Sequence, residues 1–233
     1  MNNSFITKKG KRKSNQDVIL IKDLGLNQEL YLLADGMGGY QNGKFAADFV
    51  VTQLYNSFKS IAHFNKENIQ DSVNNTTIAL KKEIELKSKK MGATLGGVIV
   101  DDNKIMCFWV GDVKIFHFKK DKIIYESKEH NLKNELIENN VFTESESANK
   151  FSHVVTRSIQ SDLEKSKIGF KKFNNFEKGD LLIICSDGVT DVINNYELLN
   201  LFKPKCNVLE KINELDAKLS EIAKDNYSLI LLY

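Results

Sequence analysis

Features that mark secreted, zinc-binding or membrane proteins are scarce in this sequence. The three cysteines, Cys107, Cys185 and Cys206, are odd in number and lie far apart, which argues against a disulfide framework or a zinc site. No apolar run approaches the roughly 20 residues of a membrane span. The opening segment MNNSFITKKGKRKSNQ also lacks the apolar core of a signal peptide. We therefore expect a cytoplasmic protein that has no membrane as a partner.

An excess of charge of either sign is also missing. Lys and Arg number 33 and Asp and Glu number 31, which gives a net charge of +2. This balance supplies no bulk field that would favour nucleic acid as a partner. Arginine itself is rare, because Arg12 and Arg157 are the only two in the chain. Each of them therefore calls for a specific reason.

Proline and linker-like tracts are nearly absent. Pro204 is the single proline, and the chain has no internal repeat and no low-complexity tract. A chain of 233 residues with 42% hydrophobic residues is long enough to bury one sizeable core. We therefore predict one domain that spans residues 1–233, and we expect it to be a monomer.

The first part of the chain contains two strands followed by two helices. Short β-rich runs at 17–21 and 29–34 indicate the strands. Apolar residues then recur at steps of three and four over 46–61 and again over 69–84, which predicts the helices. Asn65 is placed to cap the second helix.

The rest of the chain returns to strand patterns. Residues 93–127 consist of β-rich runs separated by tight polar turns, which predicts consecutive antiparallel hairpins in a meander. Residues 128–165 are polar and weakly periodic, so we expect an irregular segment there. Further strands are predicted at 167–173, 180–188 and 227–233, and a helix at 195–223. This order predicts an α+β domain in which two antiparallel sheets pack together with helices outside.

The stretch LYLLADGMGGYQNGKFAADFV at residues 30–50 allows two interpretations. Gly38 to Lys44 spells G-x-x-x-x-G-K between a strand and a helix, which is the setting of a nucleotide-binding P-loop. However, Phe45 stands where a P-loop has the Ser or Thr that holds magnesium. The other interpretation starts from Asp35, which the strand delivers to the rim of the sheet, where binding sites are commonly built.

Aspartates recur at the ends of other predicted strands in the same way. Three of the five lie beside a glycine, which lets the backbone approach a ligand closely. Hard divalent cations such as Mg²⁺ and Mn²⁺ take oxygen ligands, so a few carboxylates on a rigid rim suit them. Taken singly, an aspartate beside a glycine is also ordinary turn chemistry. The five are Asp17, Asp35, Asp112, Asp187 and Asp225.

Six segments resemble, in order and spacing, the signature motifs of the type 2C metal-dependent Ser/Thr protein phosphatases in their short bacterial form. The resemblance extends from Arg12 to Ser228, and DGMGG and SDGVTD are specific signals within it. It implies a four-layer α-β-β-α sandwich of two antiparallel sheets flanked by helices, with a two-metal centre at one end. The segments are GKRKSNQD (10–17), LADGMGG (33–39), MGATLGG (91–97), VGDVK (110–114), CSDGVTDVI (185–193) and DNYS (225–228).

The resemblance also implies roles for individual residues. Carboxylates and the Gly36 carbonyl would hold two Mn²⁺ or Mg²⁺ ions, and Arg12 would bind the phosphate. A water that bridges the two ions would attack phosphoserine or phosphothreonine directly. Asp112 and Asp187 would hold a third, weaker ion. The implied catalytic residues are Arg12, Asp17, Asp35, Asp187 and Asp225, and the implied metal ligands are Asp17, Asp35, Gly36, Asp112, Asp187 and Asp225.

A flap and a set of partners follow from the same resemblance. HNL, beginning at His130, is similar to the family's DHSL segment, and HVVTR at 153–157 is similar to the stretch that ends the mobile flap. Residues 128–165 are therefore the expected flap. The implied partners are phosphorylated proteins and a cognate Ser/Thr kinase.

Some positions depart from the family pattern, and other functions stay open. Gln16 stands where many members carry an acidic residue. Met37 stands where eukaryotic members have a histidine, and bacterial members share this methionine. A regulatory module of the same fold, which binds phosphoproteins without turnover, is one alternative, although the retained aspartates argue against it. A P-loop hydrolase that binds ATP through Lys44 is the other.

Overall fold

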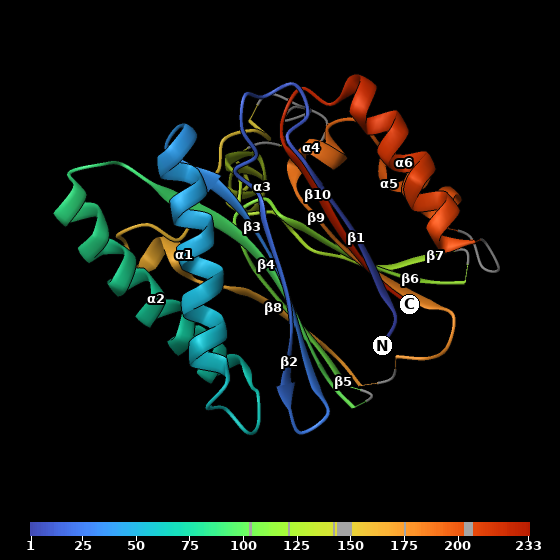
Figure 1. The fold of residues 1–233 in the computed structure, drawn as a ribbon, viewed down its shortest axis with the longest axis horizontal. Coiled ribbons are helices and arrows are strands. Elements are labelled where there is room, and N and C mark those ends of the chain that lie inside the picture. Colours follow the sequence, from blue (N-terminus) through green and yellow to red (C-terminus); the bar gives the residue numbers. More distant parts are fainter. Residues whose placement is uncertain (103, 121, 142, 144–150, 175, 203–206) are drawn as a thin grey trace.

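Two five-stranded sheets packed face to face form the centre of the structure, a computed structural model (Figure 1). The structure describes residues 1–233 with the exception of 103, 121, 142, 144–150, 175 and 203–206. Pro204 and Cys206 lie outside the described residues, so the expectation for Cys206 stays a prediction. Cys107 and Cys185 are buried free thiols, as expected.

All strand pairings within the two sheets are antiparallel. The first sheet has the order β1-β10-β9-β6-β7, and the second has the order β2-β3-β4-β5-β8. The strands are β1 (Asn3–Lys8), β2 (Val18–Gly25), β3 (Gln28–Met37), β4 (Gly92–Asp101), β5 (Lys104–Val110), β6 (Lys114–Lys119), β7 (Lys122–Glu126), β8 (Gly169–Phe173), β9 (Asp180–Cys185) and β10 (Tyr227–Leu232).

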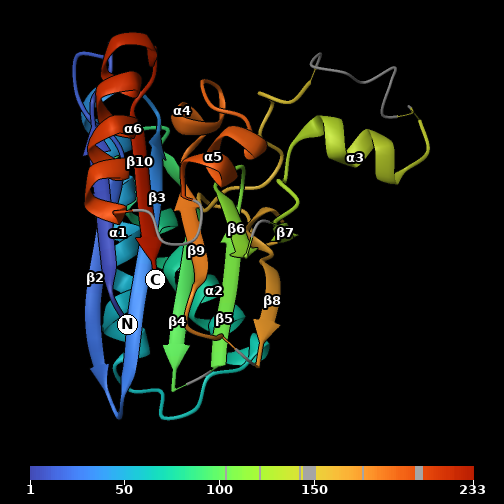
Figure 2. The same ribbon diagram turned by 90° about the vertical axis from the view of Figure 1, so that its right-hand side faces the viewer.

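Helices cover the outer face of each sheet (Figure 1). On one side α1 (Tyr40–Phe58) and α2 (Lys66–Lys87) pack on the second sheet, and on the other side α5 (Asn195–Leu201) and α6 (Val208–Ile222) pack on the first. The single-turn helix α4 (Asp187–Thr190) directly follows β9. Figure 2 shows that α3 (Leu132–Glu138) stands apart from the sheets, at the end of the molecule where α4 lies.

Three apolar clusters correspond to the three interfaces between these layers. One lies between the two sheets and contains Leu33, Ile115 and Ile184. A second lies between the second sheet and α1 and α2, and a third lies between the first sheet and α5 and α6. Every residue of β10 is buried, which explains why all of its residues except Ser228 are apolar or aromatic. The predicted α+β sandwich with helices outside both sheets is therefore confirmed.

The predicted meander at 93–127 is wrong in one respect. Its two hairpins form, but β4 and β5 lie in the second sheet whereas β6 and β7 lie in the first. The chain crosses between the sheets at residues 111–113, the connection that contains Asp112. A hairpin pattern is the same in either sheet, so the alternation in the sequence carries no signal for this crossing.

Two of the predicted helices begin or end elsewhere than expected. The first starts at Tyr40, directly after Gly38 and Gly39, whose φ values of 120° and 77° make the tight turn out of β3. The helix predicted at 195–223 is divided into α5 and α6, because Asn207 caps a new helix. Asn65 caps α2 as predicted, in a reciprocal capping box with Asn68.

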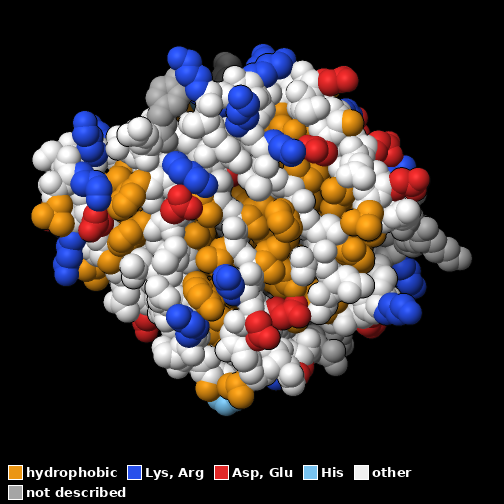
Figure 3. Space-filling model, viewed as in Figure 1, with side chains coloured by type: hydrophobic (Ala, Val, Ile, Leu, Met, Phe, Trp, Pro, Cys, Tyr) orange, Lys and Arg blue, Asp and Glu red, His pale blue; other side chains and the backbone are white. Residues whose placement is uncertain are grey.

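The remaining differences concern irregular and edge segments. The strand β1 was not predicted, because only Ile6 within it is fully buried and its ends are polar. The segment 128–165 is largely irregular where it is described, but it contains α3 and a 3₁₀ turn at Glu164–Ser166. Among the described residues, no helix combines the length and apolarity that crossing a bilayer requires. Figure 3 shows basic and acidic side chains interspersed on one face, in keeping with the balanced charge.

Candidate metal centre

Four of the five predicted aspartates are brought to one end of the sandwich by the strands beside them. Asp17 directly precedes β2, and Asp35 lies near the end of β3, which pairs with β2. Asp187 follows β9, and Asp225 precedes β10, which pairs with β9. One hydrogen bond joins the two pairs of strands across the sheets, because Ser186 Oγ donates to Asp17 Oδ2 at 2.9 Å.

Asp17 is deeply buried, with 2% of its surface exposed. The serine that donates to its Oδ2 is itself held in place, since Ser186 Oγ accepts the backbone N–H of Ser228 at 2.9 Å. Oδ1 of Asp17 has no hydrogen-bond partner among the described residues. Burial raises the pKa of Asp17 to about 6, although hydrogen bonds from Ser228 and Ser186 oppose the change.

Asp35 shows that all five aspartates share one electrostatic environment. Burial is the main reason why its pKa lies well above the usual range, and the next reason is repulsion from the charges of the other four. Asp187 behaves in the same way, since burial and then the charges of Asp112 and Asp225 raise its pKa well above the usual range. Its Oδ1 is also buried without a partner among the described residues. Carboxylates so placed repel one another unless a cation lies between them.

Asp112 lies at the edge of this group. It follows Gly111, whose φ of 97° turns the chain from one sheet to the other, and it is 9% exposed. Burial raises its pKa, and so does the charge of Asp191. Asp191 was within the SDGVTD motif but received no role from the sequence. Burial and the charge of Asp225 raise the pKa of Asp191, so it is a sixth acidic group at this end of the molecule.

These residues fit a site for hard divalent cations. Two buried carboxylate oxygens, Asp17 Oδ1 and Asp187 Oδ1, lack any partner in the described part of the chain, and an unpaired buried oxygen is costly. Burial and mutual repulsion raise the pKa values of the same carboxylates. As the side chains lie in the described ranges, no three His, Cys, Asp or Glu residues are close enough together to hold a metal ion without moving. An all-oxygen donor set of this kind suits Mg²⁺ or Mn²⁺ and not a soft metal.

The Gly36 backbone packs against the first turn of α1. A Cβ added to Gly36 would lie 2.1 Å from the carbonyl oxygen of Gly43, and a Cβ added to Gly43 would lie 2.7 Å from the carbonyl oxygen of Gly36. Both contacts are with backbone, which cannot move aside as a flexible side chain can. Glycine at both positions therefore allows the loop after β3 to close on the helix.

Replacing Gly36 with alanine tests this packing. We expect Gly36→Ala to lower the free energy of unfolding by about 2 kcal/mol, because overpacking against rigid backbone is destabilising. Urea denaturation measures the change. Gly25→Ala is the matched control, since a Cβ at Gly25 meets nothing within 4 Å and the cost there is only that of its positive φ. Equal losses in the two variants would contradict the role of the Gly36 contact.

Arg12 contacts one of the predicted metal ligands. Its Nε donates to Asp225 Oδ1 at 2.8 Å and its Nη2 donates to Oδ2 at 2.6 Å, so the ion pair is bidentate. The Arg12 side chain is 61% exposed. Gly10 allows the loop to approach, because its φ is 55° and an added Cβ would lie 2.1 Å from the Asp225 carbonyl oxygen. The arginine predicted to bind phosphate thus lies against Asp225, one of the predicted metal ligands.

The P-loop interpretation of residues 38–44 is not supported by the placement of its lysine. Lys44 Nζ donates to the backbone carbonyl of Asp17 at 3.2 Å and lies 3.7 Å from Asp48 Oδ1. The Lys44 amine therefore links α1 to the residue that precedes β2. Since Gly43 packs against Gly36, the glycines close the loop on β3.

A small hydrogen-bond network holds the connection that carries Asp112. The backbone N–H of His130 donates to the Gly111 carbonyl at 2.8 Å, and the Gly111 N–H donates to His130 Nδ1 at 3.2 Å. The ring stacks on Trp109, and Nη1 of Arg157 lies 3.4 Å from Nε2. Burial and the charge of Arg157 lower the pKa of His130 to about 4, so the ring is neutral at pH 7. The HNL and HVVTR motifs therefore contact each other through His130 and Arg157, next to the connection that contains Asp112.

A cavity of about 490 Å³ opens beside the aspartates. It is lined by Gly188, Asp191, Val192, Ile222, Lys224 and Asp225. Asp225 thus lies between Arg12 and an open space that is large enough for a phosphorylated side chain. None of its lining residues except Asp225 had been predicted as a site residue.

Known proteins resemble this chain over most of its length. Residues 8–223 match the family model described as protein phosphatase 2C. The chain is 30% identical over 215 residues to a putative protein phosphatase 2C-type of Streptococcus pyogenes, covering 88% of this chain and 85% of the relative.

Solved structures show the same architecture. A serine/threonine phosphatase of S. agalactiae aligns with a TM-score of 0.86 and 26% identity, covering 100% of this chain and 98% of that one. The catalytic domain of the serine/threonine protein phosphatase PstP, in complex with two manganese ions, aligns with a TM-score of 0.80 over 99% of this chain and 96% of that one. Its identity is 20%, so this second likeness concerns the fold.

Proposed function

Because the chain belongs to the protein phosphatase 2C family and is therefore a protein serine/threonine phosphatase, we propose that its aspartate cluster is a two-metal catalytic centre. The observation that carries the proposal is Asp35, whose pKa is raised by the charges of the four other predicted aspartates. The proposed ligands are Asp17, Asp35, Asp187 and Asp225 with the Gly36 carbonyl, and Asp112 with Asp187 for a third, weaker ion.

The chemistry divides between the cations and the chain. When bound, two divalent cations supply Lewis acidity, which brings the pKa of an attacking water toward neutrality and offsets the charge on the phosphate. The carboxylates of the aspartates have fixed positions because each lies beside a strand of a rigid sheet. Ser186 orients the Asp17 carboxylate through its hydrogen bond to Oδ2. Arg12 offers a planar cation that contacts two phosphate oxygens, once it has left Asp225.

Replacing Arg12 separates its proposed binding of phosphate from its ion pair with Asp225. We expect Arg12→Ala to raise KM for a phosphopeptide about tenfold, because an ion pair to the phosphate in the ground state is lost. We also expect Mn²⁺ to bind more tightly, because Asp225 no longer has a competing cation. Steady-state kinetics and isothermal titration calorimetry with Mn²⁺ measure the two effects. An unchanged KM together with a collapsed kcat would mean that Arg12 acts in the transition state.

The proposed function is tested by phosphate release from a phosphothreonine peptide with Mn²⁺, with Mg²⁺ and with excess chelator. We expect release with either metal and none in chelator. Release that continues in chelator would contradict the two-metal centre. A protein that binds Mn²⁺ but releases no phosphate would instead be a phosphoprotein-binding module of the same fold.

Several expectations remain proposals beside this one. We propose that residues 1–233 act as one catalytic domain and that phosphorylated proteins, including substrates of a cognate Ser/Thr kinase, are its substrates. The cytoplasmic location, the monomeric state and the choice between Mn²⁺ and Mg²⁺ stay predictions. The segment 128–165 is the proposed flap, and its residues 142 and 144–150 lie outside the described part of the chain.

A further inference from the structure

A second cavity lies far from the five aspartates, at the other end of the sandwich. It has a volume of about 830 Å³. We call it the distal pocket and define it by Glu29, Asp102, Leu181, Phe202 and Tyr233, which line it. Glu29 lies near the start of β3, whose other end carries Asp35, and Leu181 lies near the start of β9, which leads to Asp187. The metal centre therefore does not include this pocket.

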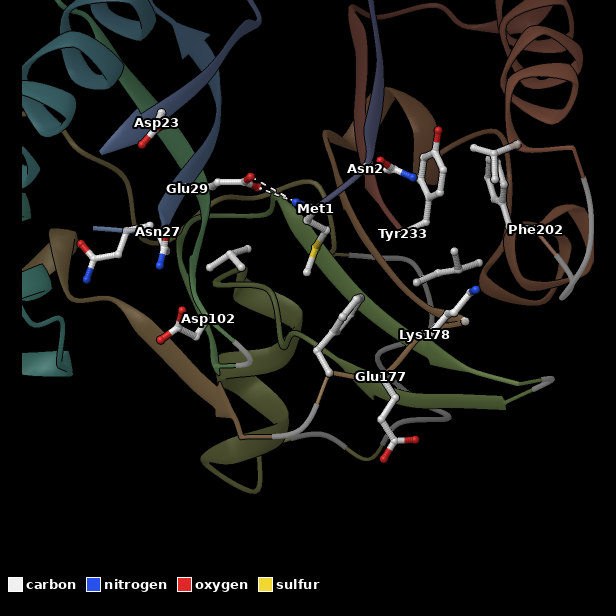
Figure 4. A pocket seen from close by; sticks show the side chains of 16 residues that line it. Met1, Asn2, Asp23, Asn27, Glu29, Asp102, Glu177, Lys178, Phe202 and Tyr233 are labelled. Atoms are coloured by element: carbon white, nitrogen blue, oxygen red, sulfur yellow. Dashed lines mark hydrogen bonds and ion pairs between the residues drawn. The ribbon is translucent and has the colours of Figure 1, made fainter. Parts of the chain in front are cut away.

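The lining of the distal pocket is divided into an acidic side and an apolar side. Figure 4 shows Asp23, Glu29 and Asp102 on one side, where the β2–β3 and β4–β5 hairpins turn. Phe202 and Tyr233 lie on the opposite side, at the ends of α5 and β10. The volume is within the usual range for small-molecule sites, about 300 to 1,000 Å³. A ligand that filled it would meet the partly exposed Tyr233 ring at one end and carboxylates at the other.

Among the described residues that line this pocket, cations are fewer than carboxylates. The lining contains the carboxylates of Asp23, Glu29, Asp102 and Glu177, against the Lys178 amine and the Met1 ammonium. Glu177 is paired with Lys119, which lies outside the lining, at 2.9 Å.

The two hairpin carboxylates are available to a cation. Within the described part of the chain, Asp23 Oδ1 accepts the N–H of Gly25 at 2.6 Å, and neither Asp23 nor Asp102 forms an ion pair there. Glu29 shows what the acidic side can hold, because the Met1 ammonium lies 3.1 Å from its Oε1. Met1 combines a cation with an apolar side chain, and both line the pocket (Figure 4).

From this arrangement we propose that the distal pocket binds an organic cation with an apolar body. The apolar body lies against Leu181, Val208 and Tyr233, which are partly exposed, whereas Phe202 is buried behind them. The cationic group lies at the hairpin carboxylates of Asp23 and Asp102, beside Glu29. This site is separate from the phosphatase centre, so the proposal does not rest on the proposed function.

The experiment compares two probes that differ in the charged group. Isothermal titration calorimetry on the full chain in chelator measures 4-phenylbutylamine, a cation at neutral pH, and 4-phenylbutyrate, its anionic counterpart. We expect the amine to bind at least about fivefold more tightly than the carboxylate, the difference that roughly one exposed ion pair supplies. We expect the preference to shrink in about 1 M NaCl, where the Debye length is about 3 Å.

A double variant tests the position of the cation. Asp23→Asn with Asp102→Asn removes both hairpin charges at nearly constant shape. Asn at position 102 tolerates the left-handed backbone, where φ is 52°, and Asn at position 23 can still accept the Gly25 N–H. We expect this variant to lose the preference for the amine. Asp71→Asn on the exposed face of α2 is the matched control and should bind the amine as wild type does.

A further variant tests the apolar part of the site. Val208→Trp places a large ring at the pocket wall and should weaken both probes several-fold, with a native thermal unfolding transition as the check on folding. Absence of amine binding, equal binding of the two probes, or a preference that survives the double variant would each overturn the proposal.

Discussion

Asp187→Asn is expected to lose at least about a thousandfold in metal-dependent phosphate release and, in chelator, to unfold at a higher temperature than wild type. The two effects have the same cause. Asp187 is buried among like charges, and burial together with the charges of Asp112 and Asp225 raises its pKa well above the usual range. The carboxylate should therefore destabilise the metal-free fold, while in the proposed centre it contributes charge to the metal site.

The measurement combines kinetics with thermal unfolding. Phosphate release from the phosphothreonine peptide is followed with Mn²⁺, and unfolding is followed by circular dichroism in chelator and in Mn²⁺. A chain of this size gains about 3 °C for roughly 1 kcal/mol. We expect Asp187→Asn to gain about that amount in chelator and to gain less than wild type from Mn²⁺.

The control for Asp187→Asn is Asp71→Asn, which removes one exposed carboxylate elsewhere. It should change neither activity nor the effect of Mn²⁺. Wild-type activity in Asp187→Asn would remove this residue from the centre. A loss of activity together with a lower unfolding temperature in chelator would mean that Asp187 supports the fold and that the repulsion is outweighed.

Short-range patterns in the sequence were enough to place the strands that carry the aspartates. The run before Asp35 is apolar and ends at glycines, so the strand and the following turn could be predicted. The same is true of the run before Asp187. The assignment of these carboxylates to one site came from the resemblance to a family, because spacing along the chain does not say which strand ends meet.

Contacts between distant segments could not be predicted. The Arg12 and Asp225 pair joins residues 213 positions apart, and the Ser186 to Asp17 bond spans 169 positions. The first contact depends on the pairing of β1 with β10 within one sheet, and the second depends on how the two sheets pack. No local pattern encodes either. The crossing at 111–113 escaped prediction for the same reason, and the distal pocket exists only because hairpin turns of one sheet face Phe202 and Tyr233 of the other layer.

The metal-free protein is expected to become less stable as the pH rises from about 4 to about 6, by roughly 3 kcal/mol for Asp17 alone. Burial raises the pKa of folded Asp17 to about 6, whereas in the unfolded chain it lies near 3.8. Between these values the folded state holds the extra proton, so raising the pH favours unfolding. Above both values the folded protein carries a buried anion with an unpaired oxygen.

Urea unfolding of wild type and Asp17→Asn, in chelator, at about pH 4.5 and about pH 7.5, measures this effect. We expect Asp17→Asn to become more stable relative to wild type at the higher pH, because wild type alone then carries the buried Asp17 anion. The contributions of the titratable groups that both proteins share cancel in this difference. In Mn²⁺ the order should reverse at the higher pH, since a cation stabilises the ionised carboxylate that it binds. A difference that does not depend on pH would show that the Asp17 carboxyl has the same pKa in the folded and unfolded chain. In the proposed centre, the buried carboxylates that destabilise the metal-free fold are also the groups whose negative charge a divalent cation needs. We therefore expect removal of Asp17, Asp35 or Asp187 to raise the stability of the metal-free protein and to lower its activity.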